Sequence, residues 1–311
     1  LLMGNVTVTT DGSGNVTLTG DSSANVIRIS IVNQSIVVKG ILTQINGGST
    51  AVPLPMASGT TDTTAGSITV NLGDGIDFVD FKGIRIGGSL TVSGSNGADI
   101  TALRKSTVNG DFSVGTGSDD AGKDSLAIID STVTGNLNVS QGTGDDLFIG
   151  AKVNVGGTVN LAQGDGNDVA TLDATTVGGA VNVDAGTGND LLVAGFQSSG
   201  FDLRMGDGND LAILTPVKTT GGSATVDLGT GTDGFGLGGG PIASTLVVDG
   251  GDGTDRVFIG PQVVTGGTSQ VNVESNLSFS LDFTKSNPIF SKFGGAFVKL
   301  GLFKALLSGL P

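Results

Sequence analysis

The chain of 311 residues contains no cysteine, histidine, tryptophan or tyrosine, and only seven prolines. Without cysteine no disulfide can form, so the fold has to be held by packing and hydrogen bonds, and the redox compartment stays open. Glycine is abundant, with 55 residues, but it does not recur at every third position, which excludes a collagen-like structure. So narrow a set of residue types indicates one local environment that is used many times.

Glutamate is nearly absent as well, because Glu274 is the one glutamate among the 29 acidic residues. Aspartate favours turns and the ligation of hard cations over helices. The net charge of −14 argues against nucleic acid as a partner. No stretch of about 18 uninterrupted apolar residues occurs, so we expect no transmembrane helix. The chain starts at Leu1 and no basic signal segment precedes Gly4, so we expect the numbering to start after a processing site.

A Gly-x-Gly-x-Asp phrase, or a degraded form of it, returns along the middle of the chain. Clear copies are Gly164-Asp165-Gly166-Asn167-Asp168 and Gly206-Asp207-Gly208-Asn209-Asp210. Successive copies lie 20 to 25 residues apart, most often 22, and the longest interval carries an insertion around 119–123. Their last aspartates are Asp77, Asp99, Asp124, Asp146, Asp168, Asp190, Asp210, Asp233 and Asp255.

Each of these aspartates is followed by a short apolar strand, and a Gly-Gly or Gly-Asn turn then leads into a second strand. Short strands bounded by turn signals at one period are typical of solenoid coils. The glycine content and the alternation of apolar and polar residues exclude helical repeats. The sequence therefore predicts an all-β, right-handed parallel β-helix, or β-solenoid, of about nine coils of about 22 residues.

Stacked coils would place like residues in columns. In the second strand of each coil, Asn138, Asn160, Asn182 and Asn272 are expected at equivalent outward positions. Their amides would form a hydrogen-bonded ladder, or they are solvated polar residues on an outer face, and both interpretations stay open. The inward pairs are expected to be Leu90/Val92, Phe112/Val114, Leu137/Val139, Val159/Leu161, Val181/Val183 and Phe201/Leu203.

The first strand is apolar on both faces across several consecutive coils. Alternation places residues such as Leu126, Ile128 and Leu172 inward. The opposite face carries Leu147, Ile149, Val169, Leu191, Val193, Leu211 and Ile213. A strand that is hydrophobic on both sides is normally covered on both sides, so we expect another segment or another subunit to pack there.

The two ends differ from the middle. Residues 1–65 are expected to form an N-terminal β cap and a loop, with a hairpin turn at 11–14, residues 66–278 the solenoid, and residues 279–311 a C-terminal segment. That segment is rich in lysine and phenylalanine and predicts a short helix with Phe290, Phe293 and Phe297 on one side, near Lys292 and Lys299. It would cap its own solenoid, dock into a neighbouring subunit or bind a membrane surface.

The Gly-Asp-Gly-Asn-Asp phrases resemble the turns of the RTX calcium-binding β-roll family. This resemblance implies calcium as a cofactor, held by carboxylates that stacking would bring into rows. The expected ligands are Asp146, Asp168, Asp190 and Asp210, with Asp145, Asp165 and Asp207 nearby. The alternative is that each aspartate closes an Asx-type turn while glycine supplies the positive φ.

The repeats over 66–275 are also similar to those of large secreted or surface β-solenoid proteins of bacteria. The resemblance implies an extracellular or cell-surface structural protein that associates with itself into a fibre, surface layer or matrix, with surface glycans as a second candidate partner. A β-helix enzyme acting on carbohydrate is the rival class. The chain offers few candidate bases and near-uniform coils, so we expect no catalytic activity.

Overall fold

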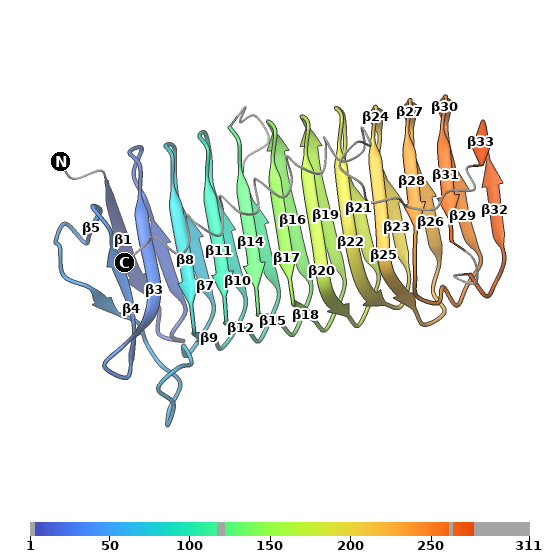
Figure 1. Cartoon of the computed structure of the whole chain (residues 1–311). Coiled ribbons are helices and arrows are strands. Elements are labelled where there is room, and N and C mark those ends of the chain that lie inside the picture. Colours follow the sequence, from blue (N-terminus) through green and yellow to red (C-terminus); the bar gives the residue numbers. More distant parts are fainter. Residues whose placement is uncertain (1–3, 117–121, 261–263, 277–311) are drawn as a thin grey trace, which may run out of the picture.

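The computed structural model describes residues 4–116, 122–260 and 264–276, and in it the chain forms a parallel β-solenoid of about nine turns (Figure 1). The predicted architecture is confirmed, and no helix occurs in the described part of the chain. None of the described residues builds a helix with the length and apolar character needed to cross a membrane.

One long face of the solenoid is a 13-stranded sheet, in which each coil contributes one strand. Like residues stack across it, as where Leu137 lies beside Val159 and Val159 beside Val181. Its strands, in spatial order, are β32 (Thr268–Val271), β29 (Leu246–Asp249), β26 (Ala224–Asp227), β23 (Phe201–Arg204), β21 (Val181–Asp184), β19 (Val159–Asp165), β16 (Leu137–Thr143), β13 (Phe112–Gly115), β10 (Leu90–Ser93), β7 (Ile68–Asn71), β2 (Val16–Thr19), β1 (Asn5–Thr10) and β5 (Gln44–Ile45).

The other long face is a 17-stranded sheet. It contains β3 (Val26–Val32), β4 (Ser35–Gly40), β6 (Val52–Pro53), β8 (Phe78–Lys82), β9 (Arg85–Ile86), β11 (Ile100–Arg104), β12 (Thr107–Val108), β14 (Ser125–Ile129), β15 (Thr132–Val133), β17 (Leu147–Ala151), β18 (Asn154–Val155), β20 (Val169–Val177), β22 (Leu191–Ser198), β25 (Leu211–Thr219), β28 (Gly234–Leu237), β31 (Arg256–Ile259) and β33 (Ser275–Asn276). A small third sheet joins β24 (Asp207–Gly208), β27 (Thr230–Gly231) and β30 (Asp252–Gly253) at one turn.

The hydrophobic core fills the space between the two long sheets. Phe112 and Phe201 from the 13-stranded sheet and Phe81 and Phe148 from the 17-stranded sheet are among its fully buried side chains. All the inward pairs predicted for the second strand are buried, as are the inward residues predicted for the first strand. The alternation of apolar and polar residues therefore predicted the core correctly.

The N-terminal region joins the solenoid earlier than the predicted boundary. The hairpin expected at 11–14 is present, since β1 pairs antiparallel with β2. However, β2 and β3 already pair in parallel with β7 and β8, so the first coil starts at Val16. The antiparallel strand β4 and the short strands β5 and β6 come from the insertion that follows this coil.

The placement of Asn272 was predicted wrongly. The register sets Ser269 beside Val247, in the row that contains Asn182, so Ser269 takes the outward position. Asn272 follows the end of β32 with a φ of 51°, and its amide donates to Asp249 instead. The predicted C-terminal helix, with Phe290, Phe293, Phe297, Lys292 and Lys299, lies outside the described residues.

Candidate functional site

The repeated aspartates form one continuous row along an edge of the solenoid, as predicted. The backbone N–H of each aspartate donates to Oδ1 of the aspartate in the next coil, at 2.6 Å from Asp146 to Asp168 and 2.7 Å from Asp190 to Asp210. The row starts at the N–H of Asn25 and ends at the side chain of Glu274. Its members between these ends are Asp77, Asp99, Asp124, Asp146, Asp168, Asp190, Asp210, Asp233 and Asp255.

These carboxyl groups are buried, and in Asp77, Asp190 and Asp255 burial favours the neutral form. It raises the pKa of Asp77 to about 6 and that of Asp190 to about 7, and the neighbouring Asp210 and Asp168 also raise the pKa of Asp190. Burial raises the pKa of Asp255 in the same direction. In Asp77 and Asp190, Oδ2 is buried and accepts no hydrogen bond from the described residues, which is costly for an ionised carboxylate.

Asn25 indicates what the site accommodates when no carboxyl is present. It occupies the first position of the row and is fully buried. Its Nδ2 donates to the carbonyl oxygens of Ser23 at 2.7 Å and Leu72 at 3.2 Å. Because the position takes a neutral side chain that donates hydrogen bonds, a protonated carboxyl, which also carries a donor, is compatible with it.

Two further rows with acidic residues lie on the outside of the same turn: Asp145 is followed by Asn167 and Asn189, whereas Asp165 and Asp207 belong to the row of Thr187. Asp145 is half-buried and forms an ion pair of 2.6 Å with Lys123, whose hydrogen bond holds the pKa of Asp145 well below its usual range. Asp165 and Asp207 are exposed, and they accept hydrogen bonds from Thr187 at 2.9 Å and Thr230 at 3.0 Å. Within residues 4–116, 122–260 and 264–276, no three carboxylates lie close enough together to hold a metal ion.

Hydroxyl groups separate the carboxylates in the row that contains Asp165 and Asp207. The register places Thr187 between Asp165 and Asp207, and Thr230 between Asp207 and Asp252. Neighbouring coils lie about 4.8 Å apart, so this alternation doubles the distance between like charges. The sequence contains the signal for this row, because threonine and aspartate alternate at the repeat period, although the alternation was not predicted.

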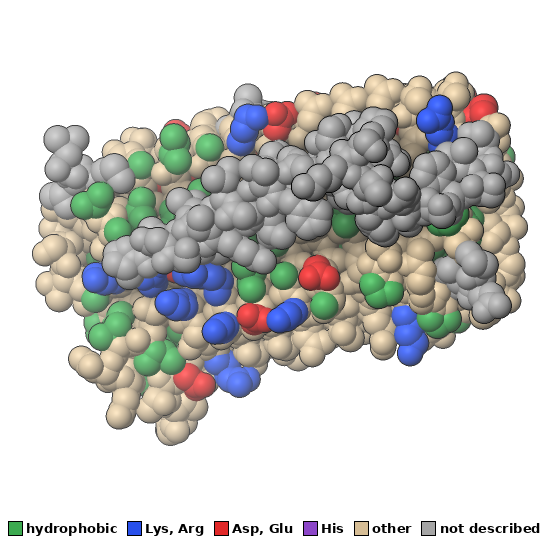
Figure 2. All heavy atoms as spheres, in the orientation of Figure 1, with side chains coloured by type: hydrophobic (Ala, Val, Ile, Leu, Met, Phe, Trp, Pro, Cys, Tyr) green, Lys and Arg blue, Asp and Glu red, His purple; other side chains and the backbone are tan. Residues whose placement is uncertain are grey.

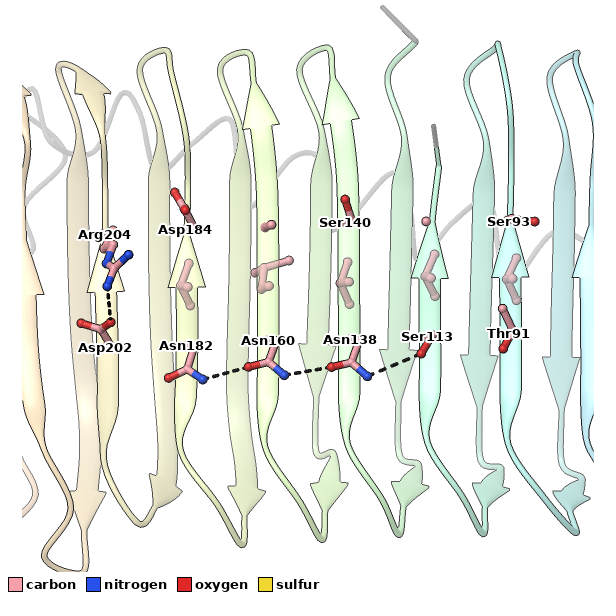
Figure 3. Close-up of a pocket in the computed structure, with 17 residues that line it drawn as sticks. Thr91, Ser93, Ser113, Asn138, Ser140, Asn160, Asn182, Asp184, Asp202 and Arg204 are labelled. Atoms are coloured by element: carbon pink, nitrogen blue, oxygen red, sulfur yellow. Dashed lines mark hydrogen bonds and ion pairs between the residues drawn. The ribbon is translucent and has the colours of Figure 1, made fainter. Parts of the chain in front are cut away.

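The predicted asparagine ladder is present on the outer face of the 13-stranded sheet (Figure 3). Asn182 donates to Asn160 and Asn160 donates to Asn138, both at 2.8 Å, and Asn138 donates to Ser113 at 3.5 Å. The ladder ends near Asp202, which pairs with Arg204.

A shallow groove of about 570 Å³ runs beside this ladder. Its wall includes the small residues Gly115, Ser140 and Ala162, which alternate along the strands with inward residues. The groove and its polar row follow the long axis of the solenoid (Figure 3).

The outer face of the 17-stranded sheet carries the predicted apolar residues, which we call the apolar stripe. Leu147, Ile149 and Leu191 are buried, and Val193, Leu211 and Ile213 are partly buried. Figure 2 shows this side of the molecule, where lysine and arginine side chains gather beside hydrophobic ones.

An ion cluster on strands β3, β8 and β11 bounds the stripe. The side chains of Arg28 and Arg104 both pair with the carboxylate of Asp80. Two guanidinium groups on one carboxylate leave a net positive charge at this end of the stripe.

Comparisons with known protein families, with curated proteins and with solved structures found no match for this chain. Its function therefore has to be argued from its own geometry.

Proposed function

We propose that this protein is an extracellular structural β-solenoid whose subunits join end to end into a fibre, surface layer or matrix. Its stacked hydrogen-bond rows support a mechanical role. The aspartate row links every coil from Asn25 to Glu274, and the asparagine ladder adds a second line of bonds in the middle of the rod. Such repetition stiffens a rod along its axis and gives each coil only its neighbours as partners.

The observation that carries the proposal is the exposed edge of the last described coil. Strand β32 lies at the end of the 13-stranded sheet, and all four of its residues are exposed. The carbonyl of Val271 accepts a hydrogen bond from Gly250, in the coil before β32, so the N–H and C=O of the adjacent Gln270 point the opposite way. An edge strand of this kind is a template for pairing with another chain.

A contact between this edge and a different surface of the next subunit would be heterologous. Contacts of that kind produce open filaments when the rotation between subunits does not close a ring. This geometry supports the proposed fibre, whose symmetry would depend on the twist between successive subunits.

The variant Gln270→Pro tests the proposal, with Gln270→Ala as its matched control. Proline removes the outward N–H and places its ring at the edge, while the hydrogen bonds between β32 and β29 are made by the neighbouring residues. We expect the parent and Gln270→Ala to form large particles in sedimentation velocity and fibres or sheets in electron micrographs. Gln270→Pro should remain monomeric at the same concentrations. Equal assembly of all three proteins, or a parent that stays monomeric throughout, would contradict end-to-end pairing through β32.

Calcium binding is a second candidate function, in keeping with the RTX-like turns. It is supported by Asp165 and Asp207, exposed carboxylates in one row beside glycines with positive φ, such as Gly166 and Gly208. Calcium that binds the folded state alone would raise the melting temperature, by an amount that grows with the logarithm of its free concentration above the dissociation constant. Melting curves recorded with calcium and with a chelator test this directly. Identical curves leave these residues as turn formers.

A further inference from the structure

Two glutamine side chains lie inside the hydrophobic core of the solenoid. Gln141 and Gln163 are 1% and 2% exposed, and the register of β16 and β19 places them side by side in adjacent coils. Leu72, Met205 and Leu228 hold the same position in other coils and are buried as well. The path of each coil therefore buries this position, whichever side chain it carries.

The amide groups of these glutamines form no hydrogen bond that would offset their burial. Nε2 and Oε1 of Gln141 and Nε2 of Gln163 are buried and have no hydrogen-bond partner within the part of the chain that the structure describes. The spacing of the coils is not the cause, because Asn160 donates to Asn138 at 2.8 Å on the outer face of the same two strands. Buried polar atoms of folded proteins are nearly always hydrogen-bonded, so the two amides indicate a bound partner.

The aspartate row borders the same space. A Cβ atom on Gly94 would overlap Oδ2 of Asp99, so the position five residues before a member of the row lies beside the inner oxygen of its carboxyl group. Gln163 holds this position before Asp168, and Gln141 holds it one coil earlier. The two amides and the carboxyl groups thus line one polar site within the core.

Small side chains on both sides make this site wider than its counterparts in other coils. Thr116 lies beside Gln141, and its hydroxyl donates to the carbonyl oxygen of that residue. Ala185 lies on the other side, beside Gln163. Both are smaller than Met205, which fills the same position further along the rod. A buried water needs space of about its own volume and two to four polar partners, and the site offers both.

We propose that ordered water binds between Gln141, Gln163 and the aspartate row and forms a constant part of the solenoid core. The unpartnered atoms are two donors and one acceptor, and water is a small ligand that both donates and accepts. A metal cation would bind Oε1 of Gln141 but would leave both Nε2 groups without an acceptor. A buried water makes about three hydrogen bonds, so one or two molecules satisfy these atoms. This site does not depend on the assembly of subunits.

A high-resolution crystal structure of the full-length protein tests the site directly. We expect electron density for water at about 2.7 to 3.2 Å from Nε2 of Gln141 and from Nε2 of Gln163. Direct hydrogen bonds from both amides to protein atoms would overturn the proposal. A metal ion at the site would overturn it as well.

Magnetic relaxation dispersion of the water signal counts long-lived internal water without a crystal. Cross-linked samples are used, so that tumbling and assembly play no part. Gln141→Met combined with Gln163→Met keeps the length of both side chains and removes their polar atoms. We expect this double variant to lose the contribution of about one or two water molecules. Gln197→Met, at an exposed position of β22, is the matched control and should retain that contribution. The same amplitude in the parent and the double variant would refute the proposal.

Filling the site provides a test by stability. Ala185→Met introduces the side chain that the next coil carries at Met205. Because it displaces the water and leaves the amides unsatisfied, we expect the melting temperature to fall by about 2 to 8 °C. The same substitution in the double methionine variant displaces no water and measures the cost of packing alone, so the fall should be clearly smaller there. A higher melting temperature for Ala185→Met, or an equal fall in both backgrounds, would contradict bound water.

Discussion

The backbone N–H of Asp168 donates a hydrogen bond of 2.7 Å to Oδ1 of Asp190, its counterpart one coil further along the solenoid. The N–H of Asp190 makes the same bond to Asp210. Each side chain thus satisfies a backbone donor of the preceding coil while its own backbone is satisfied by the following coil. The row couples the coils to one another, and its carboxyl groups are buried as a consequence.

The stability of the solenoid should fall as the pH rises from about 4.5 to 8. The folded pKa values of Asp77 and Asp190, about 6 and about 7, lie above the ordinary value of 3.8. The stabilisation that each of these protonated carboxyl groups contributes to the folded state is therefore complete below pH 3.8. It is lost as the pH rises to the folded pKa, at about 1.4 kcal/mol per group and pH unit. Asp145 has the opposite effect, because its pKa is lowered in the folded state. As the pH falls below 3.8, its protonation therefore lowers the stability of the protein. Urea unfolding at constant ionic strength should give a maximum near pH 4 to 5, and a free energy of unfolding that rises towards pH 8 would contradict the neutral row.

Asp190→Asn should stabilise the protein at pH 8 and have little effect at pH 4.5. The amide Oδ1 can still accept the hydrogen bond from Asp168, and no charge has to be buried. We expect a gain of about 2 to 4 kcal/mol at pH 8 and a change within about 1 kcal/mol at pH 4.5. Asp165→Asn, on the exposed outer row, is the control and should change stability by less than about 0.5 kcal/mol at either pH. Strong destabilisation by Asp190→Asn at pH 8 would show that an ionised carboxylate is needed there.

Asn160→Ala should cost about 1 to 2 kcal/mol in urea unfolding. It removes the hydrogen bond donated to Asn138 and the one accepted from Asn182, each worth about 1 kcal/mol at a half-exposed site. Thr91→Ala provides the control, because Thr91 lies in the same outward row beyond the ladder and is exposed. If both variants lose the same small amount, the amide ladder contributes nothing beyond solvated polar groups.

Gly188→Ala should prevent folding or destabilise the solenoid by more than about 4 kcal/mol. Gly188 has a φ of 129°, and an added Cβ would overlap the carbonyl oxygen of Gly166 in the adjacent coil. Gly221→Ala separates the two effects, because Gly221 has a φ of 132° but open space around its Cβ position. We expect that control to lose only about 1 to 3 kcal/mol from backbone strain. Similar melting temperatures for the two variants would show that the coils can separate to admit the methyl group.

Much of the fold followed from the repeat period. The period of about 22 residues predicted that Asp146, Asp168 and Asp190 would align, and alternation predicted which side chains enter the core, because a strand exposes successive residues on opposite faces. The period did not reveal that Asn25 continues the row. An asparagine outside the glycine phrase carries no repeat signal, and the insertion after the first coil separates it from Asp77 by 52 residues.

Variation in the length of the coils limited the prediction of which residues stack at the C-terminal end of the solenoid. Asn272 sits in an alternating Val-Asn-Val sequence that resembles the earlier ladder positions, yet the register gives its place to Ser269. Coils of 20 and 23 residues precede this point, so sequence spacing alone no longer indicates which residues are stacked. The backbone pairing decides the register, because it satisfies a whole strand of hydrogen bonds at once.

The sequence by itself determined the architecture of this protein, because apolar alternation and glycine turns at one period allow few structures other than stacked coils. Only the tertiary structure decided the environment of each polar group. The same Gly-Asn-Asp phrase places the side chain of Asn167 in solvent and that of Asp168 in the interior. That difference depends on how the turn meets the next coil, and at the next position of the inner row burial raises the pKa of Asp190 to about 7.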